Sequence, residues 1–195
     1  MSFQSQRLNH VRRRLSLWLA AWFVSLSPVQ GESGYRLLGP ADFDGLAVRV
    51  ELEPGDFLLF PDGTWENVTL RFRGRGTREK PITLRPLNAG KFALRGRSTL
   101  IVDGEWLVVE GLQLQNEAGA ESVVILKGRN NRLTSNRIDG PASRGAIQIV
   151  GSGHRVDRCL FSEAQSLDSL VVVESANDGA VKPIFEENRF GGARP

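Results

Sequence analysis

Two side chains of this sequence could form a nucleophile and its base, Cys159 and His154, which lie five residues apart. A cysteine becomes nucleophilic when a neighbouring histidine takes its proton. His154, however, ends a glycine-containing turn, residues 151–154, that precedes a short strand, and Cys159 lies inside the segment RVDRCLF, where a small side chain packs. This placement favours a structural cysteine. As the single cysteine, it also allows no internal disulfide.

Carboxylates and lysines are the next candidates. Glu186-Glu187-Asn188 offers oxygen ligands for a metal ion, but adjacent side chains on a strand point to opposite faces, so the two glutamates do not converge. The lysines that could act as a base lie in turns or at strand ends. They are Lys80, Lys91, Lys127 and Lys182. The sequence therefore assigns no catalytic, cofactor-binding or metal-binding residue.

Arginines form the third group, and two interpretations of them stay open. Several of them recur close to successive copies of a repeat, so they could share one face and form a cationic groove. They could equally be solvated turn side chains. The same alternatives hold for the basic segment RFRGRGTREK (71–80). The recurring arginines are Arg129, Arg132, Arg137, Arg144, Arg155 and Arg158.

The elements that hold these side chains follow from a repeat. RVDRCLF (155–161) shares its pattern with RLTSNRI (132–138) and IFEENRF (184–190), and VVEGLQL (108–114) is a looser copy. Each copy has an apolar residue, two variable residues, a bend residue, one variable residue and a second apolar residue. The bend residues, 24, 23 and 29 residues apart, are Leu112, Asn136, Cys159 and Asn188. Such spacing indicates a solenoid or another repeat array.

The residue types select the kind of solenoid. A second apolar run precedes each later copy, and its residues Val124, Ile147 and Val171 repeat at 23 and 24 residues. Short runs of Val, Ile and Leu between Gly, Asn, Asp and Ser are typical of strands and turns. We therefore predict an all-β fold, a parallel β-helix of roughly six rungs, each rung being three short strands with their turns. The alternative is a β-sandwich with strands that are similar by chance.

Two expectations about the interior follow. The bend residues should stack in neighbouring rungs, where asparagines hydrogen-bond along the pile and tolerate the left-handed backbone conformation. The apolar residues on either side of the bend alternate with charged ones, as on a strand buried on one face. We expect these to face the interior: Leu133, Ile138, Val156, Phe161, Phe185 and Phe190.

Residues 1–31 have the features of a secretory signal peptide. Four arginines precede an apolar stretch, residues 15–27, and small residues at 29–31 suit cleavage. The alternative, an uncleaved membrane anchor, needs about 20 apolar residues. We therefore expect a secreted or periplasmic protein that is free of the membrane after cleavage.

Removal of this leader changes the charge of the protein. The whole chain has 25 basic and 22 acidic residues, a net charge of +3. Without the four leader arginines, 21 basic residues stand against 22 acidic ones, a net charge of −1. Overall basicity therefore gives no reason to expect nucleic-acid binding.

We expect residues 32–195 to form one β-helix domain. A short helix over residues 41–50 should cover its first rung, because an uncovered solenoid end exposes both core and strand edge. Only GGARP follows the last repeat, so no cap is expected there. This pattern favours a domain truncated at its C-terminal end, or one that pairs with a partner.

Several segments of the sequence, taken in order along the chain, resemble polysaccharide lyase family 6, which contains chondroitinase B and alginate lyases. They include PGDFLLFPDGTWENVTLRF (54–72), GTREKPITLRPLNAGKFALRG (76–96) and GEWLVVEGLQLQN (104–116), followed by GRNNRLTSNRI (128–138) and GHRVDRCLF (153–161). The resemblance runs over residues 42–195. It implies a right-handed parallel β-helix, a monomer in its full-length form, that cleaves an acidic, uronate-containing polysaccharide by β-elimination.

The resemblance also implies a mechanism. In this family a calcium ion, held by an asparagine and two acidic residues, neutralises the uronate carboxylate, a lysine removes the proton next to it, and an arginine assists the leaving oxygen. In that family, the sequence segments that carry these residues follow the repeat that corresponds to IFEENRF. None of these functional residues can therefore be placed on this chain. We expect the chain alone to be inactive.

Two functions therefore stay open. One is an exported lyase for alginate or for a glycan of the chondroitin or dermatan type, with its catalytic half beyond this chain. The other is a non-catalytic exported β-helix that binds an acidic glycan or a partner protein. The sequence selects neither the polysaccharide nor the residues that contact it.

Overall fold

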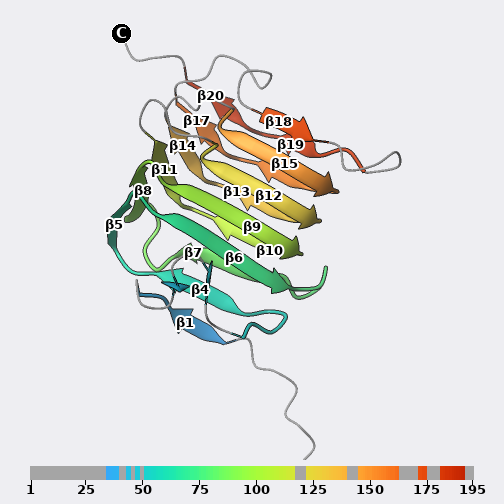
Figure 1. Cartoon of the computed structure of the whole chain (residues 1–195). Coiled ribbons are helices and arrows are strands. Elements are labelled where there is room, and N and C mark those ends of the chain that lie inside the picture. The colour runs from blue at the N-terminus through green and yellow to red at the C-terminus, as the bar shows by residue number, and fades with distance from the viewer. Residues whose placement is uncertain are drawn as a thin grey trace, which may run out of the picture. The chain divides into compact units, whose positions relative to one another are not determined.

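The computed structural model describes residues 34–39, 43–44, 47–48, 51–116, 122–139, 145–162, 171–174 and 181–191. The chain divides into two units, Met1–Gln30 and Gly31–Pro195, and every described residue belongs to the second. The expected signal peptide, residues 1–31, lies outside the described residues. Within the second unit, strands wind through three sheets (Figure 1).

The strands of the three sheets have the following bounds. Sheet A contains β1 (Tyr35–Leu37), β4 (Phe57–Phe60), β7 (Ile82–Pro86), β10 (Leu107–Glu110), β13 (Arg132–Thr134), β16 (Arg155–Asp157) and β19 (Ile184–Glu186). Sheet B contains β2 (Phe43–Asp44), β3 (Ala47–Val48), β6 (Thr69–Arg75), β9 (Thr99–Glu105), β12 (Val124–Arg129), β15 (Ile147–Ser152) and β18 (Val171–Glu174). Sheet C contains β5 (Gly63–Glu66), β8 (Phe92–Gly96), β11 (Gln113–Asn116), β14 (Arg137–Asp139), β17 (Leu160–Phe161) and β20 (Arg189–Phe190).

The chain passes through sheet A, sheet C and sheet B once per rung. Five complete rungs run from β4 to β18, and β19 and β20 begin a sixth. Equivalent strands pair in parallel, with Leu133 opposite Val156 in sheet A and Ile147 opposite both Val124 and Val171 in sheet B. The predicted parallel β-helix and the registration of its repeats are confirmed.

The expected capping helix over residues 41–50 is wrong for the four of those residues that the structure describes. β2 and β3 pair as antiparallel strands, and β3 adds to β6 in parallel. A strand satisfies the open edge of sheet B, which a helix cannot pair with. Among the described residues no helix has the length and hydropathy needed to cross a membrane.

The interior is filled by the inward-facing side chains of the three sheets. Leu133, Ile138, Val156 and Phe161 are 0–2% exposed, as predicted. Their neighbours at the last described rung are less covered. Phe185 is partly buried against the core, and Phe190 is 38% exposed although its ring stacks on that of Phe161, with centroids 5.4 Å apart. Phe185 and Phe190 thus lie in register with the buried Val156 and Phe161 and face the interior, as predicted.

The bend residues stack from rung to rung, as predicted. Asn136 accepts a hydrogen bond on Oδ1 from the Leu112 N–H at 2.9 Å and donates from Nδ2 to the Val109 carbonyl at 3.0 Å. Its Nδ2 lies 4.0 Å from the sulfur of Cys159. Asn188 accepts from the Cys159 N–H at 3.0 Å. These side chains bridge backbone groups where the sheet changes direction.

The left-handed conformation, however, belongs to the residue before each bend residue. Positive φ angles occur at Gly111 (70°), Ser135 (56°), Arg158 (53°) and Glu187 (53°). The expectation that the bend asparagines adopt this conformation is wrong. The asparagine is selected instead for its amide, which accepts from one backbone group and donates to another in the neighbouring rung.

A second buried ladder lies at the bend from sheet B to sheet A, and the sequence repeat did not indicate it. The Oδ1 of Asn131 accepts from the Leu107 N–H at 3.0 Å, and its Nδ2 donates to the Lys127 and Gly104 carbonyls at 2.7 and 3.0 Å. In the next rung the Nδ1 of His154 accepts from the Asn131 N–H at 3.3 Å. His154 is fully buried, and this burial lowers the pKa of the imidazole.

The buried imidazole makes stability depend on pH. The folded protein holds His154 neutral, while the unfolded chain protonates it near pH 6.5. The contribution of the neutral imidazole to the free energy of unfolding is therefore complete above that pH, and it is lost as the pH falls towards the lower folded pKa. We expect the wild type to lose up to about 1.4 kcal/mol for each pH unit in that window. His154→Asn should flatten this slope and keep the fold, because Asn131 makes the equivalent contacts one rung earlier. Urea unfolding at several pH values measures both. Equal slopes in the two proteins would contradict the assignment.

Truncation of a core side chain tests the interior. Phe161→Ala should lower the free energy of unfolding by about 3–5 kcal/mol, because Phe161 is fully buried. Leu160→Ala is the matched control, since Leu160 is the preceding residue and only half-buried, and we expect a loss of about 1 kcal/mol or less. Urea unfolding of both variants measures the difference. A loss below about 1 kcal/mol for Phe161→Ala would show that this ring is not part of the core.

Candidate functional site

The outer face of sheet A carries a groove at the bends through which the chain enters this sheet. On β13 and β16 the inward residues are Leu133 and Val156, so Arg132 and Arg155 project outward. The groove has a volume of about 450 Å³, within the range of ligand sites. We call it the axial groove. It is lined by Arg78, Pro81, Trp106, Val108, Asn130, Arg132, Gly153, Arg155 and Ile184.

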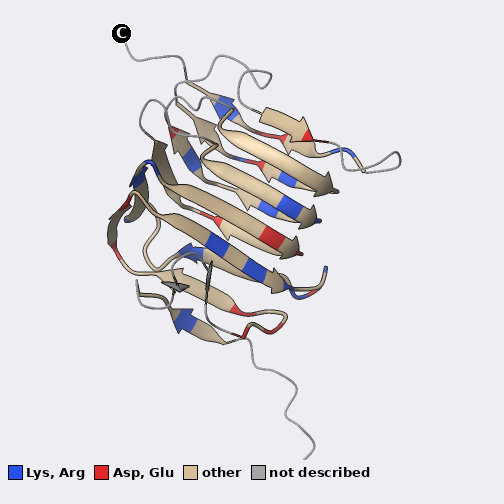
Figure 2. Cartoon of the chain, viewed as in Figure 1, with Lys and Arg blue, Asp and Glu red and all other residues tan. Residues whose placement is uncertain are grey.

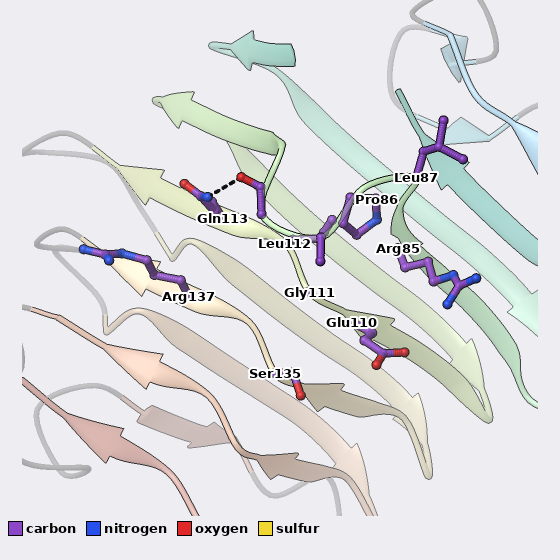
Figure 3. Close-up of a pocket in the computed structure, with 11 residues that line it drawn as sticks. Arg85, Pro86, Leu87, Glu110, Gly111, Leu112, Gln113, Ser135 and Arg137 are labelled. Carbon is purple, nitrogen blue, oxygen red and sulfur yellow. Dashed lines mark hydrogen bonds between the residues drawn. The ribbon is translucent and has the colours of Figure 1, made fainter. Parts of the chain in front are cut away.

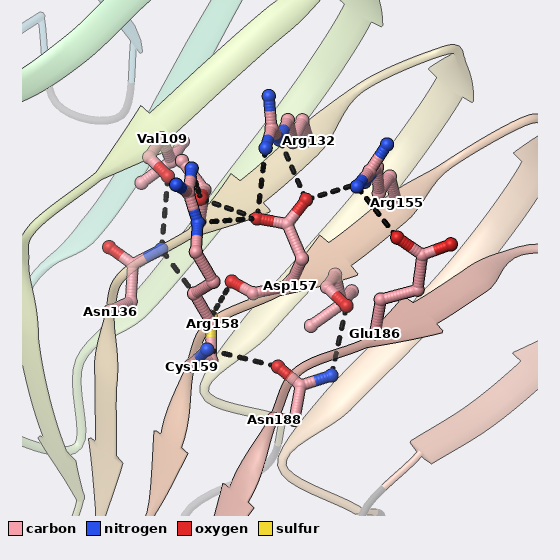
Figure 4. Close-up of polar contacts among 11 residues, drawn as sticks. Val109, Arg132, Asn136, Arg155, Asp157, Arg158, Cys159, Glu186 and Asn188 are labelled. Atoms are coloured by element: carbon pink, nitrogen blue, oxygen red, sulfur yellow. Dashed lines mark hydrogen bonds and ion pairs between the residues drawn. The ribbon is translucent and has the colours of Figure 1, made fainter.

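Beside the axial groove, one carboxylate is surrounded by three guanidinium groups (Figure 4). Asp157 binds Arg132 in a bidentate manner at 2.8 and 3.1 Å and Arg155 at 2.5 Å. The Oδ1 atom of Asp157, which Arg155 does not contact, lies 3.4 Å from the Nε of Arg158 and accepts a hydrogen bond from Thr134. Although Asp157 points outward, it is 1% exposed, because these side chains cover it.

The charge of Asp157 is stabilised by these contacts. Burial alone raises the pKa of a carboxyl group, but the hydrogen bonds from Arg132 and Thr134, together with the charge of Arg132 and the bond from Arg155, bring the pKa of Asp157 below its ordinary value. The carboxylate therefore stays ionised and holds the arginines in fixed positions. Fixed guanidinium groups lose less entropy when they bind a ligand.

The two arginines of the axial groove keep donors for a ligand. Arg132 uses two of its five N–H groups on Asp157, and Arg155 uses one on Asp157 and one on Glu186, at 2.7 Å. Three N–H groups remain on each, and both side chains are partly exposed, at 36% and 43%. Planar guanidinium groups suit carboxylates and other oxyanions. The groove can therefore bind an anionic ligand.

Lys and Arg residues lie on strands of more than one sheet (Figure 2), and the recurring arginines do not all meet on this face. Arg132, Arg155 and Arg158 surround Asp157. Arg129 ends β12 in sheet B, and Arg137 lies in sheet C, where it pairs with Asp139 at 2.5 Å. Arg144 lies outside the described residues.

The other candidates have structural surroundings. Burial raises the pKa of Cys159 to about 11, so it is a thiol at neutral pH, and its sulfur contacts Asn136 and not His154. Glu186 pairs with Arg155, while the amide of Asn188 is bonded to Cys159 and Val156. Lys80, Lys91 and Lys182 are exposed and Lys127 is partly buried.

The described residues do not fit a calcium site. Among them, no group of three or more His, Cys, Asp and Glu side chains could hold a metal ion. The asparagine and glutamate nearest to the expected pattern, Asn188 and Glu186, are already bonded within the protein. No catalytic step through calcium is derived for this part of the chain.

A second hollow, of about 420 Å³, lies at the bend between sheets A and C (Figure 3). Its charged side chains are Arg85, Glu110 and Arg137, and Gln113 closes one side through a 2.6 Å bond to the Gly90 carbonyl. The guanidinium of Arg85 lies 5.3 Å from the centre of the Phe57 ring. The charges in this hollow are mixed, so it favours an anionic ligand less than the axial groove does.

Sequence reasoning missed two features of the axial groove. Trp106 lies in the segment GEWLVVEGLQLQN (104–116), and the sequence assigned it no role. Arg78 was one of several basic residues in segment 71–80. The signal that could have found Trp106 is its alignment with Asn130 and Gly153, since tryptophan is unexpected among residues that adopt positive φ. Arg78 carried no such signal.

Comparison with known proteins identifies the family. A family model described as chondroitinase B matches residues 46–184, which is most of the chain. The chain belongs to the chondroitinase B family. This membership agrees with the resemblance of the sequence segments to polysaccharide lyase family 6 and with the parallel β-helix.

Solved structures share the fold of this chain. A mannuronic-acid-specific lyase of polysaccharide family 6 from the human gut microbiota is 25% identical, with a TM-score of 0.63, over 83% of this chain and 41% of the lyase. The family 6 alginate lyase AlyGC, as an arginine-to-alanine mutant, is 20% identical, with a TM-score of 0.56, over 78% of this chain and 26% of that enzyme. A family 6 polysaccharide lyase from Pseudopedobacter saltans is 22% identical, with a TM-score of 0.52, over 71% of this chain and 42% of that protein.

The chain thus spans between about a quarter and two fifths of the length of these relatives. A search of the curated proteins gave no match to it.

Removal of the central carboxylate tests the arginine cluster. Asp157→Asn should lower the free energy of unfolding at pH 7 by about 2 kcal/mol, because three guanidinium groups lose a buried, ionised partner. Because the folded pKa is lowered, the contribution of Asp157 is present above the unfolded value near pH 3.9 and is lost as the pH falls through the folded pKa. The two proteins should therefore converge in stability below about pH 4.

The control is Asp103→Asn, which removes an exposed ion pair with Arg73 on sheet B. We expect a loss of about 1 kcal/mol or less there. Urea unfolding between neutral and acidic pH measures both variants. An Asp157→Asn protein as stable as the control at pH 7 would refute the structural role of the cluster.

Proposed function

We propose that this chain is the N-terminal β-helical part of an exported polysaccharide lyase. The lyase acts on a uronate-containing polysaccharide, of the alginate type or of the chondroitin and dermatan type, by β-elimination. The observation that carries the proposal is the match of residues 46–184 to the chondroitinase B family. The sequence of residues 1–31 supports export to the periplasm or the medium.

The relatives support the substrate class. The 25% identical structure is described as a mannuronic-acid-specific lyase, and another family 6 neighbour as an alginate lyase. Mannuronic acid is a uronate, so each sugar unit of such a polymer carries a carboxylate. The outer face of sheet A offers guanidinium groups of Arg132 and Arg155 held by a buried aspartate, and these bind carboxylates well.

In this proposal the present chain binds and orients the glycan, and later rungs of a longer protein supply the elimination. Proton abstraction next to a carboxylate needs a positioned base and a stabilised negative charge. Among the described residues, no group of three or more His, Cys, Asp and Glu side chains could hold a metal ion to stabilise that charge. Calcium and its ligands, the base, and a monomeric state are therefore proposed for the longer protein.

A non-catalytic, glycan-binding β-helix is the second candidate. The observation in its favour is that basic side chains line the axial groove, while the described residues contain no group of acidic, His and Cys side chains that could hold a metal ion. The two candidates differ in chemistry, because only a lyase creates a new double bond in its product.

The test is the absorbance of unsaturated uronate. A longer protein that contains this chain, and the 195-residue chain itself, are each incubated with alginate and with dermatan or chondroitin sulfate, with calcium and with a chelator. We expect absorbance to rise only with the longer protein, on one of these glycans, and only with calcium. No rise under any condition, together with retention of the chain on a glycan column, would overturn the lyase proposal in favour of the second candidate.

A further inference from the structure

The backbone at Trp106 is unusual for its side chain. Its φ is 54°, in the left-handed region that bulky residues disfavour. The residues at the same bend in the next two rungs are Asn130, with φ 54°, and Gly153, with φ 69°, both of which tolerate this conformation. A residue kept in an unfavourable conformation, where a tolerant one stands in the neighbouring rungs, points to a functional role.

The side chain of Trp106 has no structural task that explains its presence. It is half-buried, and it is not among the side chains that pack on the core. Within the part of the chain that the structure describes, its indole makes no hydrogen bond, ring contact or cation–π contact. A half-exposed indole without a partner is typical of a surface that binds something.

We propose that Trp106 is the stacking platform of a uronate subsite in the axial groove, where Arg132 and Arg155 bind the carboxylate of the sugar. This inference rests on the proposed function and deepens it, because it names the residues that would read the charge and the ring of the substrate. No covalent step takes place at this subsite.

The composition of the groove carries the proposal. Trp106 and Val108 supply an apolar and aromatic surface at one part of the groove, and Arg132 and Arg155 stand on the next two rungs. A sugar ring presents C–H groups on its faces, which pack on an aromatic ring, while its polar groups lie at the edge. Adjacent strands are about 4.8 Å apart, so a ring on Trp106 brings its carboxylate within reach of a guanidinium one rung away.

The charge of the groove favours an acidic sugar over a neutral one. Arg78 adds a third cation to its lining, and the lining contains no acidic side chain. The two carboxylates beside the groove, Asp157 and Glu186, are already paired with its arginines. The N–H groups that remain on Arg132 and Arg155 would form charge-assisted hydrogen bonds with a carboxylate, and only weaker ones with the hydroxyl groups of a neutral sugar.

Aromatic and arginine side chains also bind single-stranded nucleic acid, by stacking and by contact with phosphates. The uronate is favoured here because the groove offers one aromatic platform and not a series, and because the chain belongs to the chondroitinase B family. An oligonucleotide is therefore a comparison ligand in the test.

The experiment is calorimetric titration of the 195-residue chain with short oligouronates prepared from alginate. Neutral cello-oligosaccharides of equal length and an oligodeoxythymidylate serve as comparisons. The variants are Trp106→Asn, which places the residue type of Asn130 at this bend, and Arg78→Gln. Neither touches Asp157, so the arginine cluster stays intact in both. Arg73→Gln removes the same charge from an exposed position on sheet B and is the matched control.

We expect the wild type to bind the oligouronate and not the neutral sugar, and Trp106→Asn to weaken binding about ten-fold. Arg78→Gln should weaken it by about two- to five-fold, and Arg73→Gln should leave it unchanged. Thermal unfolding supplies a second measurement. Because asparagine tolerates the left-handed conformation, Trp106→Asn should unfold at the same temperature as the wild type or higher, so its loss of affinity cannot be a loss of folding.

Three results would overturn the inference. Equal oligouronate affinity in the wild type and Trp106→Asn would show that Trp106 is not a stacking platform. An affinity for the neutral sugar equal to that for the oligouronate would show that the arginines do not bind the carboxylate. Tighter binding of the oligonucleotide would assign the groove to nucleic acid. None of these touches the proposed function, because the elimination assay on the longer protein reports that separately.

Discussion

The solenoid depends on the satisfaction of buried backbone groups at its bends. Strands of two to seven residues pair rung to rung, but each change of direction leaves N–H and C=O groups that a sheet ladder does not reach. Two internal stacks supply the missing partners. Asn131 and His154 serve the bend into sheet A, and Asn136 and Asn188 serve the bend into sheet C. Without these side chains, the buried backbone groups that they pair with would stay unsatisfied at these bends.

The same strands connect the interior with the outer face. On β16, Val156 packs in the core while Arg155 and Asp157, on either side of it, face outward. A shift of one residue in this strand would expose the valine and bury the charges. The core therefore determines the position of the arginines, and the carboxylate of Asp157 then sets the orientation of their guanidinium groups. This is how a scaffold of repeated strands can present a defined anionic-ligand site.

Trp106 shows the opposite relation between stability and function. At the bend from sheet B to sheet A, Asn130 and Gly153 suit the left-handed backbone, whereas Trp106, at the same bend one rung earlier, does not. In a chondroitinase B family chain, an unfavourable conformation beside a groove of arginines is consistent with binding as the selected property. Proteins tolerate such local costs where the surrounding structure is well determined, and here the ladder of Asn131 lies directly beneath.

The sequence alone determined the repeat, because alternation of apolar residues and a rung of about 23 residues are local patterns that the parallel ladder preserves. It placed Leu133 and Val156 in the core and Asn136 beside Cys159. Only the tertiary structure decided which residue of each bend is left-handed, that β2 and β3 are strands, and that Arg132, Arg155 and Arg158 share Asp157. These features arise from contacts between rungs, where backbone hydrogen bonds and burial override local preference. A charged residue in one copy of the repeat carries no sign of the partner that stacking brings to it.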